Sequence, residues 1–474
     1  MQKYHCPALL ACLLLAASSL PAQLISTPSA SIRWISSTPS APWQQMQIEA
    51  APSSIEPAAP PSTQPAASAI QLDSHTTFQT IDGFGSCFND LGWQALQALD
   101  PPAREQALQS LFAPTGANFT LGRSPMGAND FATAWYSYDE TPNDFALTHF
   151  SIDHDRQTLL PFIHAAMRYQ PTLGIWAVPW SPPTWMKTNG AYKGGEMKND
   201  PQTLASYALY FSKYIQAYRA EGVNLFAVMP QNEPRYNNNV YPQAVWSGAL
   251  IDTFLRDYLI PRLRQDKLSI QLWHGTIVNE NLADYILPVL DDPKTAPSIT
   301  GIAYQYGGQQ ALAATHQQFP DKKLMQSETE CYNGDNLWQQ GLITFRKIIE
   351  DTNNFAGSYF FWNTVLDDRE TSSWGWRQNS LLTVDRAAKQ VRYNPEFYSM
   401  KHFSASVLPG ARRIAVTGGP FPQIVAFANP NGSQVVEFEN DSTQPLDATL
   451  QSAGKFYLLH VPAKSMNTVT FDAR

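Results

Sequence analysis

Short apolar runs, each followed by a stretch with helical periodicity, recur from residue 78 onward. Between the runs, Pro201–Glu221 places its large apolar residues on one helical face, and Ala244–Arg264 and Asn336–Glu350 follow the same pattern. Strand–helix alternation repeated eight times favours a closed parallel (β/α)8 barrel, and an open doubly wound sheet is the alternative. The eight runs predicted to be strands are Thr80–Phe84, Asn118–Arg123, Gly174–Pro179, Leu225–Met229, Ile270–His274, Ile299–Tyr304, Lys323–Gln326 and Ser358–Trp362.

After residue 405 the helical pattern stops and apolar and polar residues alternate. Turn sequences such as Pro-Asn-Gly and Asn-Asp-Ser separate the segments, as expected for a small antiparallel β-sandwich. Two short strand-like segments that precede the barrel, Ser31–Ile35 and Met46–Ile48, could pair with this β-sandwich. The predicted strands are Ile414–Val416, Gln423–Ala428, Gln434–Glu439, Leu446–Gln451, Lys455–Val461 and Thr468–Phe471.

The segment before the barrel divides into two parts. Residues 1–22 resemble a secretory signal peptide, with Lys3, an apolar stretch from Ala8 to Leu20 and a small residue, Ala22, at a possible cleavage site. A lipoprotein cleavage box ending at Cys12 is the less favoured alternative. The apolar stretch is too short to span a membrane. We therefore expect a secreted or periplasmic protein without an integral membrane span.

These patterns predict four regions along the chain. They are a signal peptide (1–22), a Ser/Pro/Ala-rich linker whose strands could join the β-domain (23–70), the catalytic barrel (71–404) and the C-terminal β-sandwich (405–474).

Composition and short motifs argue against several kinds of partner and catalytic site. The net charge of −8 argues against a nucleic acid as the main partner. The nine histidines are scattered, no Cys/His cluster has zinc spacing, and neither a Gly-x-Ser-x-Gly nor a His-Glu-x-x-His motif occurs, so we expect no metal and no cofactor. Beyond the signal region only Cys87 and Cys331 remain; one disulfide bridge is possible, but two buried free thiols are favoured.

Carboxylates follow two of the predicted barrel strands. Glu233 comes directly after the fourth strand, and Glu328 and Glu330 follow the seventh. Active groups of (β/α)8 barrels lie at the carboxyl ends of the strands, so these side chains should meet at one mouth. Two carboxylates in such a position match the cleavage of glycosidic bonds, whereas solvated loop charges are the alternative interpretation.

Aromatic residues gather at the ends of three other predicted strands, the third, the sixth and the eighth. Their rings could stack on the apolar faces of sugars, although any single tryptophan could also belong to the core. Nearby polar residues could bind sugar hydroxyls. The aromatic residues are Trp176, Trp180, Trp185, Tyr304, Tyr306, Trp362, Trp374 and Trp376, and the polar ones are Asp130, Asn189 and Asn363.

An ordered set of motifs resembles family 30 of the glycoside hydrolases, the clan A group that includes glucosylceramidases and β-1,6-glucanases. The resemblance runs from about residue 78 to the C-terminus. The matching motifs are Ile81-Asp82-Gly83-Phe84-Gly85, Leu121-Gly122-Arg123-Ser124-Pro125-Met126-Gly127 with Asp130-Phe131, Tyr136-Ser137-Tyr138-Asp139, Pro179-Trp180-Ser181-Pro182-Pro183-Thr184-Trp185, Gln231-Asn232-Glu233-Pro234, Ser327-Glu328, Trp362-Asn363 and Tyr393-Asn394-Pro395.

This resemblance implies a retaining mechanism with Glu233 as acid/base and a glutamate of the seventh strand as nucleophile. The family commonly has a single glutamate two residues before the cysteine, whereas Glu328-Thr329-Glu330-Cys331 offers two candidates. Glu328 is the favoured nucleophile because Ser327-Glu328 matches the family motif, and Glu330, which directly precedes Cys331, is the alternative. The resemblance also implies that a subsite for the non-reducing sugar is lined by Asp130, Trp180, Asn232 and Trp362, and we add Tyr306 and Asn363 as candidate substrate-binding residues.

The expected function is a secreted retaining β-glycosidase that acts on β-glucosidic bonds of a β-linked glycoside or oligosaccharide, similar to glucosylceramidases. An endo-β-1,6-glucanase, a β-xylosidase and a non-catalytic carbohydrate-binding protein are the alternatives. Gln305 stands where glucosylceramidases usually have a histidine, so the resemblance does not specify which leaving group the protein prefers.

Overall fold

The computed structural model describes residue 1 and residues 32–51, 69–237, 239–452 and 454–472. Apart from residue 1, the predicted signal peptide lies outside the described residues, as does most of the predicted linker. Within the described part of the chain, no helix is both long and apolar enough to cross a lipid bilayer.

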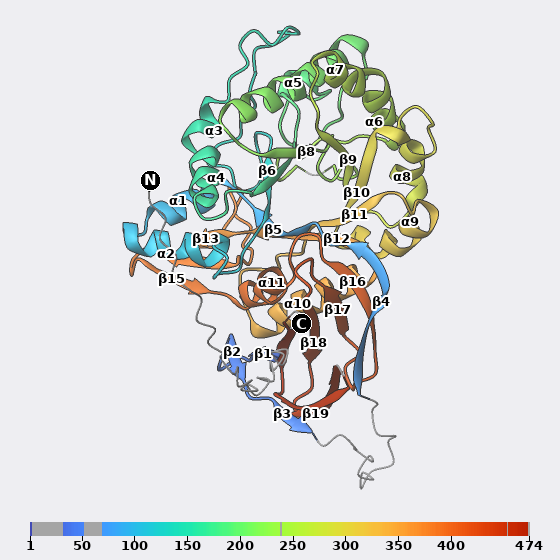
Figure 1. The fold of residues 1–474 in the computed structure, drawn as a ribbon. Coiled ribbons are helices and arrows are strands. Elements are labelled where there is room, and N and C mark those ends of the chain that lie inside the picture. Colours follow the sequence, from blue (N-terminus) through green and yellow to red (C-terminus); the bar gives the residue numbers. More distant parts are fainter. Residues whose placement is uncertain (2–31, 52–68, 238, 453, 473–474) are drawn as a thin grey trace.

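Eight parallel strands close into a barrel, in the upper half of Figure 1. The predicted (β/α)8 barrel is thereby confirmed. Its strands are β5 (Gly83–Cys87), β6 (Leu121–Pro125), β7 (Gly174–Val178), β8 (Leu225–Val228), β9 (Gln271–Ile277), β10 (Ile299–Gln305), β11 (Lys323–Glu328) and β12 (Ala356–Asn363).

Helices surround the barrel. The helix predicted over 244–264 is a continuous helical stretch from Gly248 to Gln265, with a π-helical turn at Leu255–Leu259. The helices are α1 (Asp90–Gln97), α2 (Pro101–Phe112), α3 (Asp153–Gln157), α4 (Leu159–Met167), α5 (Pro201–Ala220), α6 (Gly248–Phe254), α7 (Ile260–Gln265), α8 (Leu282–Leu290), α9 (Leu312–Gln318), α10 (Trp338–Asn353) and α11 (Pro395–Ser406).

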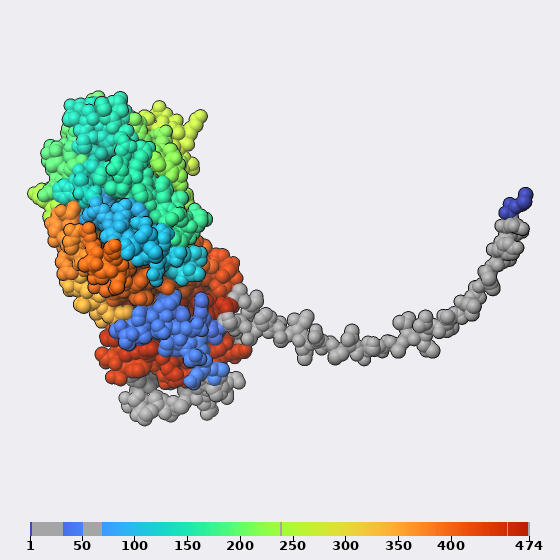
Figure 2. Space-filling view, turned by 90° about the vertical axis from the view of Figure 1, so that its left-hand side faces the viewer, coloured from blue at the N-terminus to red at the C-terminus, as the bar shows by residue number. Residues whose placement is uncertain are grey.

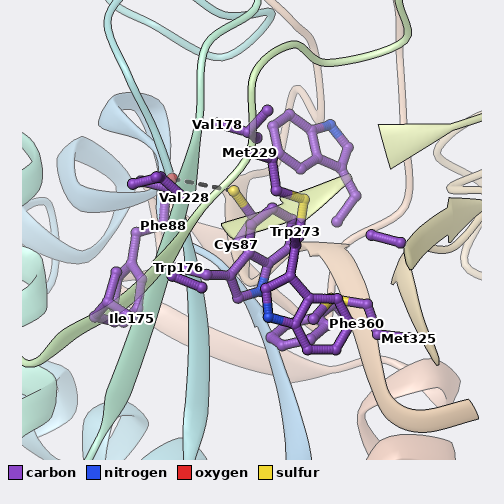
Figure 3. Packing of buried hydrophobic residues seen from close by; sticks show 14 of the residues in the cluster. Cys87, Phe88, Ile175, Trp176, Val178, Val228, Met229, Trp273, Met325 and Phe360 are labelled. Carbon is purple, nitrogen blue, oxygen red and sulfur yellow. Dashed lines mark hydrogen bonds between the residues drawn. The ribbon is translucent and has the colours of Figure 1, made fainter. Parts of the chain in front are cut away.

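Side chains fill the interior of the barrel. Trp176, Trp273, Met325 and Phe360 are buried and come from four different strands (Figure 3). A barrel of eight strands is just wide enough for such side chains to occupy it, so the interior is a packed core, and active groups are expected at the mouth formed by the loops after the strands.

A second domain lies below the barrel, built on one ten-stranded sheet with the order β2-β1-β21-β18-β17-β16-β4-β19-β20-β3. Its own apolar core brings together strands from both ends of that order, for example Trp34 and Val469 with Leu450 and Leu459. The sheet therefore closes over its core as a sandwich. Its strands are β1 (Ile32–Ser37), β2 (Gln44–Met46), β3 (Glu49–Ala51), β4 (Ile70–Thr80), β16 (Arg412–Thr417), β17 (Ile424–Ala428), β18 (Gln434–Asn440), β19 (Leu446–Ser452), β20 (Lys455–Val461) and β21 (Ser465–Phe471).

The first strands of the chain complete this second domain. β1 runs antiparallel to β21, with Trp34 opposite Val469, and the indole of Trp34 donates a hydrogen bond to Asn467 at 3.1 Å. In Figure 2 these N-terminal strands, in blue, lie against the red C-terminal ones. Segments from the two ends of the chain thus share one sheet.

The boundary predicted at residue 71 is corrected by β4. Residues 70–80 pair with β16 of the second sheet, and the barrel begins only at β5. Most side chains of β4 are exposed, unlike the fully buried strands of the barrel. The predicted strand Thr80–Phe84 therefore joined the end of one strand to the start of another.

Helices α10 and α11 attach the second domain to the barrel. Arg346 of α10 forms ion pairs with Glu439 and Asp441. His402 of α11 is buried between Ser37 and Thr468, with ring nitrogens 2.9 Å and 2.6 Å from their hydroxyl oxygens. A small sheet of β13 (Val365–Asp367), β14 (Leu382–Asp385) and β15 (Gln390–Tyr393) extends the loop after β12. Cys87 and Cys331 are both buried free thiols, as predicted.

Candidate active site

Glu233 and Glu328 lie at the carboxyl ends of two barrel strands and line the same cavity of about 130 Å³. Six of the eight predicted site residues line it. The complete lining is Asp130, Trp180, Glu233, Tyr241, Tyr306, Glu328, Thr329, Glu330, Cys331, Tyr332, Trp362, Trp376 and Gln378.

The backbone that carries Glu233 is held from both sides. The amide of Asn232 donates to the carbonyl of Pro179 at 2.8 Å, and the amide of Glu233 donates to the carbonyl of Thr276 at 3.2 Å. Glu233 has a φ of 46°, a left-handed conformation that residues other than glycine seldom adopt. Such a conformation persists only where the surrounding contacts impose it, so the direction of the Glu233 side chain is fixed by the neighbouring strands.

Glu328 forms an ion pair with the fully buried guanidinium of Arg123. Arg123 also donates to the side-chain oxygen of Asn232 at 2.6 Å, and its guanidinium lies 4.5–5.0 Å from the ring centroids of three tryptophans, Trp176, Trp180 and Trp362. A charge-assisted bond from a planar guanidinium fixes the carboxylate in direction as well as in place. Arg123 therefore orients Glu328 and the tryptophans as one unit.

Glu233 is buried and receives two hydrogen bonds. Tyr306 donates to one carboxylate oxygen at 3.0 Å and Tyr241 to the other at 2.9 Å. Burial, followed by the negative charges of Glu328 and Asp130, raises the pKa of Glu233 to about 8, and the two phenols oppose this rise. Glu233 thus carries a proton at neutral pH beside a second carboxylate, as a general acid must.

As a general acid, Glu233 would act in its protonated form, so we expect activity to fall as the pH rises through the pKa of Glu233. Tyr306 donates to the carboxylate and favours its charged form. Tyr306→Phe should therefore raise the pKa of Glu233 and move the basic limb of the kcat/KM–pH profile to higher pH, by up to about one unit. The measurement is that profile on a substrate whose leaving group needs protonation.

Tyr304→Phe is the matched control, because this phenol contacts Thr315 and does not line the cavity. A basic limb that moves to lower pH in Tyr306→Phe, or moves equally in both variants, would contradict the assignment of that limb to Glu233.

Asp130 faces the cavity from the loop after β6. Burial, with the charge of Glu328 as the second cause, raises the pKa of Asp130 to about 7. One of its carboxylate oxygens is buried without a hydrogen-bond partner in the described structure. A buried polar atom of this kind is costly unless a partner arrives, and a sugar hydroxyl at the cavity would supply one.

Two predicted substrate-binding residues, Asn232 and Asn363, do not line the cavity. The side-chain oxygen of Asn232 accepts hydrogen bonds from Arg123 and Thr276. The amide nitrogen of Asn363 donates to Gln378 at 2.8 Å and to the carbonyl of Asn379 at 3.2 Å. Asn363 ends β12 and Asn232 follows β8, as predicted, but both side chains hold neighbouring residues in position.

Three residues that the sequence did not single out matter here. Arg123 lies inside a quoted motif and could have been noticed as a charged residue within an apolar barrel strand. Tyr241 and Gln378 lie in irregular loops without a pattern that would mark them.

One group in the described part of the chain could hold a metal ion. Asp139, Asp144 and His149 place potential ligand atoms within 4.8 Å of one another, but none of them lines the cavity. Glu233 and Glu328, which line the cavity, are thus separate from this cluster.

Comparison with known proteins agrees with this architecture. The model of the glycosyl hydrolase family 30 TIM-barrel domain matches residues 81–407, and that of the family 30 beta sandwich domain matches residues 410–469. The lysosomal acid glucosylceramidase of Mus musculus is 28% identical over 426 residues, which cover 84% of this chain and 82% of that protein. The endo-1,6-β-D-glucanase BGN16.3 of Trichoderma harzianum is 27% identical over 430 residues, covering 83% and 84%.

Solved structures share the fold. SrfJ from Salmonella typhimurium superimposes with a TM-score of 0.84 at 24% identity, over 94% of this chain and all of that one. The endo-β1,6-glucanase BT3312 gives a TM-score of 0.83, also at 24% identity, with the same coverage.

Proposed function

The chain belongs to glycosyl hydrolase family 30, and on this basis we propose that it is a retaining β-glycosidase with Glu328 as nucleophile and Glu233 as acid/base. The observation that carries the proposal is that two carboxyl groups with different environments line one cavity. Glu328 is held by a guanidinium, whereas Glu233 is held by two phenols and has a raised pKa. Two carboxyl groups with different environments suit the two roles of a double displacement.

In the first step of the proposed reaction, a carboxylate oxygen of Glu328 attacks the anomeric carbon. The bond from this carbon to the leaving oxygen breaks, and the proton of Glu233 passes to that oxygen. In the second step, Glu233 takes a proton from water, the water oxygen attacks the anomeric carbon, and the bond to Glu328 breaks. Because the glycosylated Glu328 carries no charge, the pKa of Glu233 falls between the steps, which suits its change from acid to base.

Glu330 is the weaker candidate for the nucleophile. Its side chain is 55% exposed, against 12% for Glu328, and its charged neighbour is Lys347 at 3.6 Å on the surface. A nucleophile that must reach one anomeric carbon benefits from a fixed geometry in a site that excludes water. Burial and the contact with Arg123 therefore support Glu328.

We propose that the sugar cleaved from the substrate is a β-glucosyl unit. The relatives named glucosylceramidase and endo-1,6-β-D-glucanase both have names that imply such a unit, although their leaving groups differ. In this chain Asp130, Trp180 and Trp362 would bind the glucosyl ring, with the indoles against its apolar face and the carboxyl group on its hydroxyls. We also propose that the protein is exported, because residues 1–22 resemble a signal peptide.

The stereochemistry of the first product tests the mechanism. With an aryl β-glucoside, ¹H NMR should show β-glucose forming first, followed by slow mutarotation to the α-anomer. Initial release of α-glucose would mean an inverting mechanism and would contradict the assignment of Glu328 as nucleophile. Binding of β-glucosides without any hydrolysis would instead favour a non-catalytic carbohydrate-binding protein.

A further inference from the structure

Three aromatic side chains form a row that starts at Glu233 and ends in solvent. Tyr241 donates its hydroxyl to Glu233, and its ring stacks on Trp374 with the centroids 6.0 Å apart and the planes at 27°. Trp374 lies 5.3 Å from Trp376, which lines the cavity and is 42% exposed. We call Tyr241, Trp374 and Trp376 the aromatic row.

The row lies on the acid side of the cavity. The group that donates the proton, Glu233, is bonded to the first member of the row, whereas Trp180 and Trp362 pack on Arg123, the partner of Glu328. An acid that protonates the leaving oxygen has the leaving group beside it. Under the proposed function, the row is therefore in position to contact the leaving group and not the glucosyl ring.

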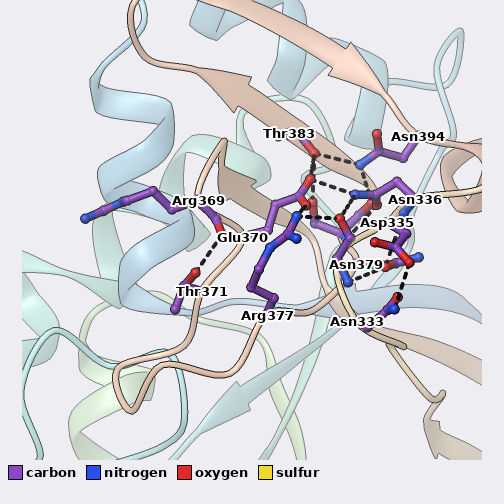
Figure 4. A network of polar contacts seen from close by, with 12 residues as sticks. Asn333, Asp335, Asn336, Arg369, Glu370, Thr371, Arg377, Asn379, Thr383 and Asn394 are labelled. Carbon is purple, nitrogen blue, oxygen red and sulfur yellow. Dashed lines mark hydrogen bonds and ion pairs between the residues drawn. The ribbon is translucent and has the colours of Figure 1, made fainter.

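The loop that presents Trp374 and Trp376 is rigidly anchored. Glu370 at its base is only 2% exposed and accepts hydrogen bonds from Asn336, Thr383 and Arg392, and it forms an ion pair with Arg377 (Figure 4). At the other side of the loop, Ser373 donates through both its amide and its hydroxyl to the carbonyl of Asp130. An exposed tryptophan on a loop fixed in this way loses little entropy when a ligand binds.

Polar groups line the same cavity as the rings of Tyr241 and Trp376. Glu330, Tyr332 and Gln378 line it together with Trp376. A sugar ring has apolar C–H faces that stack on an indole and hydroxyl groups that need acceptors and donors. A hydrocarbon chain in the same place would displace water from the Glu330 carboxylate without replacing its hydrogen bonds, which is costly.

We propose that the aromatic row binds a second sugar, so that the natural substrate is an oligosaccharide or glucan and not a glycolipid. This proposal rests on the proposed function, since it assigns the leaving group of the same reaction. It makes Trp376 a residue that determines specificity for the leaving group.

The test compares substrates that share the glucosyl unit but differ in the leaving group. β-Glucosyl fluoride has no leaving-group ring, whereas glucose disaccharides with β-1,2, β-1,3, β-1,4 and β-1,6 linkages carry a second sugar. Trp376→Ala should lower kcat/KM about tenfold on the best disaccharide, a value expected for the loss of one stacking contact, and leave the fluoride unchanged within about twofold. Leu337→Ala is the control: it is 55% exposed and follows another barrel strand, but it does not line the cavity.

Three outcomes would overturn the proposal. Equal losses on fluoride and disaccharide would give Trp376 a purely structural role, and an unchanged disaccharide rate would show that the row does not bind it. A loss seen on glucosylceramide in detergent micelles but not on disaccharides would identify a lipid leaving group.

A binding experiment separates this proposal from the proposed function. If the wild-type protein hydrolyses neither the fluoride nor any disaccharide, the proposed function fails. The affinity for a disaccharide, measured by NMR titration of Glu328→Gln with and without Trp376→Ala, still tests whether the aromatic row binds a second sugar. About tenfold weaker binding in the double variant is expected, and equal affinities would overturn the proposal.

Discussion

Glu328→Gln should lower kcat on an aryl β-glucoside by several orders of magnitude, because an amide cannot form the covalent glycosyl intermediate. Glutamine is preferred to alanine because its side-chain oxygen can still accept the hydrogen bond from Arg123. That guanidinium is fully buried and loses its counter-charge in either variant, but alanine would also remove the acceptor of its N–H group. Turnover is measured by release of the phenol, with circular dichroism to show that the fold is kept.

Glu330→Gln is the matched control for this variant, since it makes the same change two residues away on an exposed side chain. We expect its kcat to stay within a few-fold of the wild type. The reverse result, a severe loss in Glu330→Gln and little change in Glu328→Gln, would transfer the nucleophile to Glu330 and contradict the argument from burial.

Glu233→Gln should slow the hydrolysis of a glucoside with a poor leaving group by about 10²- to 10⁴-fold, the usual contribution of general acid catalysis. A 2,4-dinitrophenyl leaving group needs no proton, so the first step should survive with this substrate. The second step lacks its base, and the enzyme should release one burst of dinitrophenol and then stall. Stopped-flow absorbance measures the burst.

Azide provides the diagnostic for the same variant. As an anion it needs no base to attack the glycosyl-enzyme, so it should restore steady turnover of the dinitrophenyl substrate and yield β-glucosyl azide. The wild type should show no such acceleration. If azide fails to rescue Glu233→Gln, or if the variant loses activity equally on both leaving groups, Glu233 is not the acid/base.

The barrel was predictable because its strands are buried on both faces and therefore appear as uninterrupted apolar runs. Gly174–Val178 is the clearest case, with all five residues buried. β4 gave no such run, since most of its side chains are exposed, and its last residue was assigned to the barrel. The difference lies in the environment: a strand at the surface of a sandwich has too weak a pattern to reveal its partner.

The two carboxylates were predictable because their position at the end of a strand is a local property of the sequence. Their partners were not. Arg123 meets Glu328 across 205 residues of chain, and Tyr306 meets Glu233 across 73. Asn363 was expected to bind substrate from the end of a strand; it is the last residue of β12, but its amide donates to Gln378 instead of lining the cavity. Position along a strand predicts which end of the barrel a residue occupies, whereas the direction of its side chain depends on distant neighbours.

The leaving-group side of the cavity was the least predictable part. Trp374 and Trp376 were noted as members of an aromatic group, but their loop has neither helical nor strand periodicity, and its shape depends on the buried Glu370 and residues from three other segments. The family resemblance pointed to the glucosyl unit, and in our proposal the choice between a sugar and a lipid leaving group depends on this loop.

The shared sheet of the two chain ends also constrains how the protein is made. β1 leaves the ribosome first, yet its partner β21 ends at Phe471, and the bond between Trp34 and Asn467 joins residues 433 apart. Until β21 has been synthesised, the edges of β1 and β18 that pair with it are therefore unpaired, and unpaired edges are the places where nascent chains aggregate. The barrel strands precede β21 in the chain, whereas the second domain has to wait for β21, so a stop before this strand would leave its sheet with two unpaired edges.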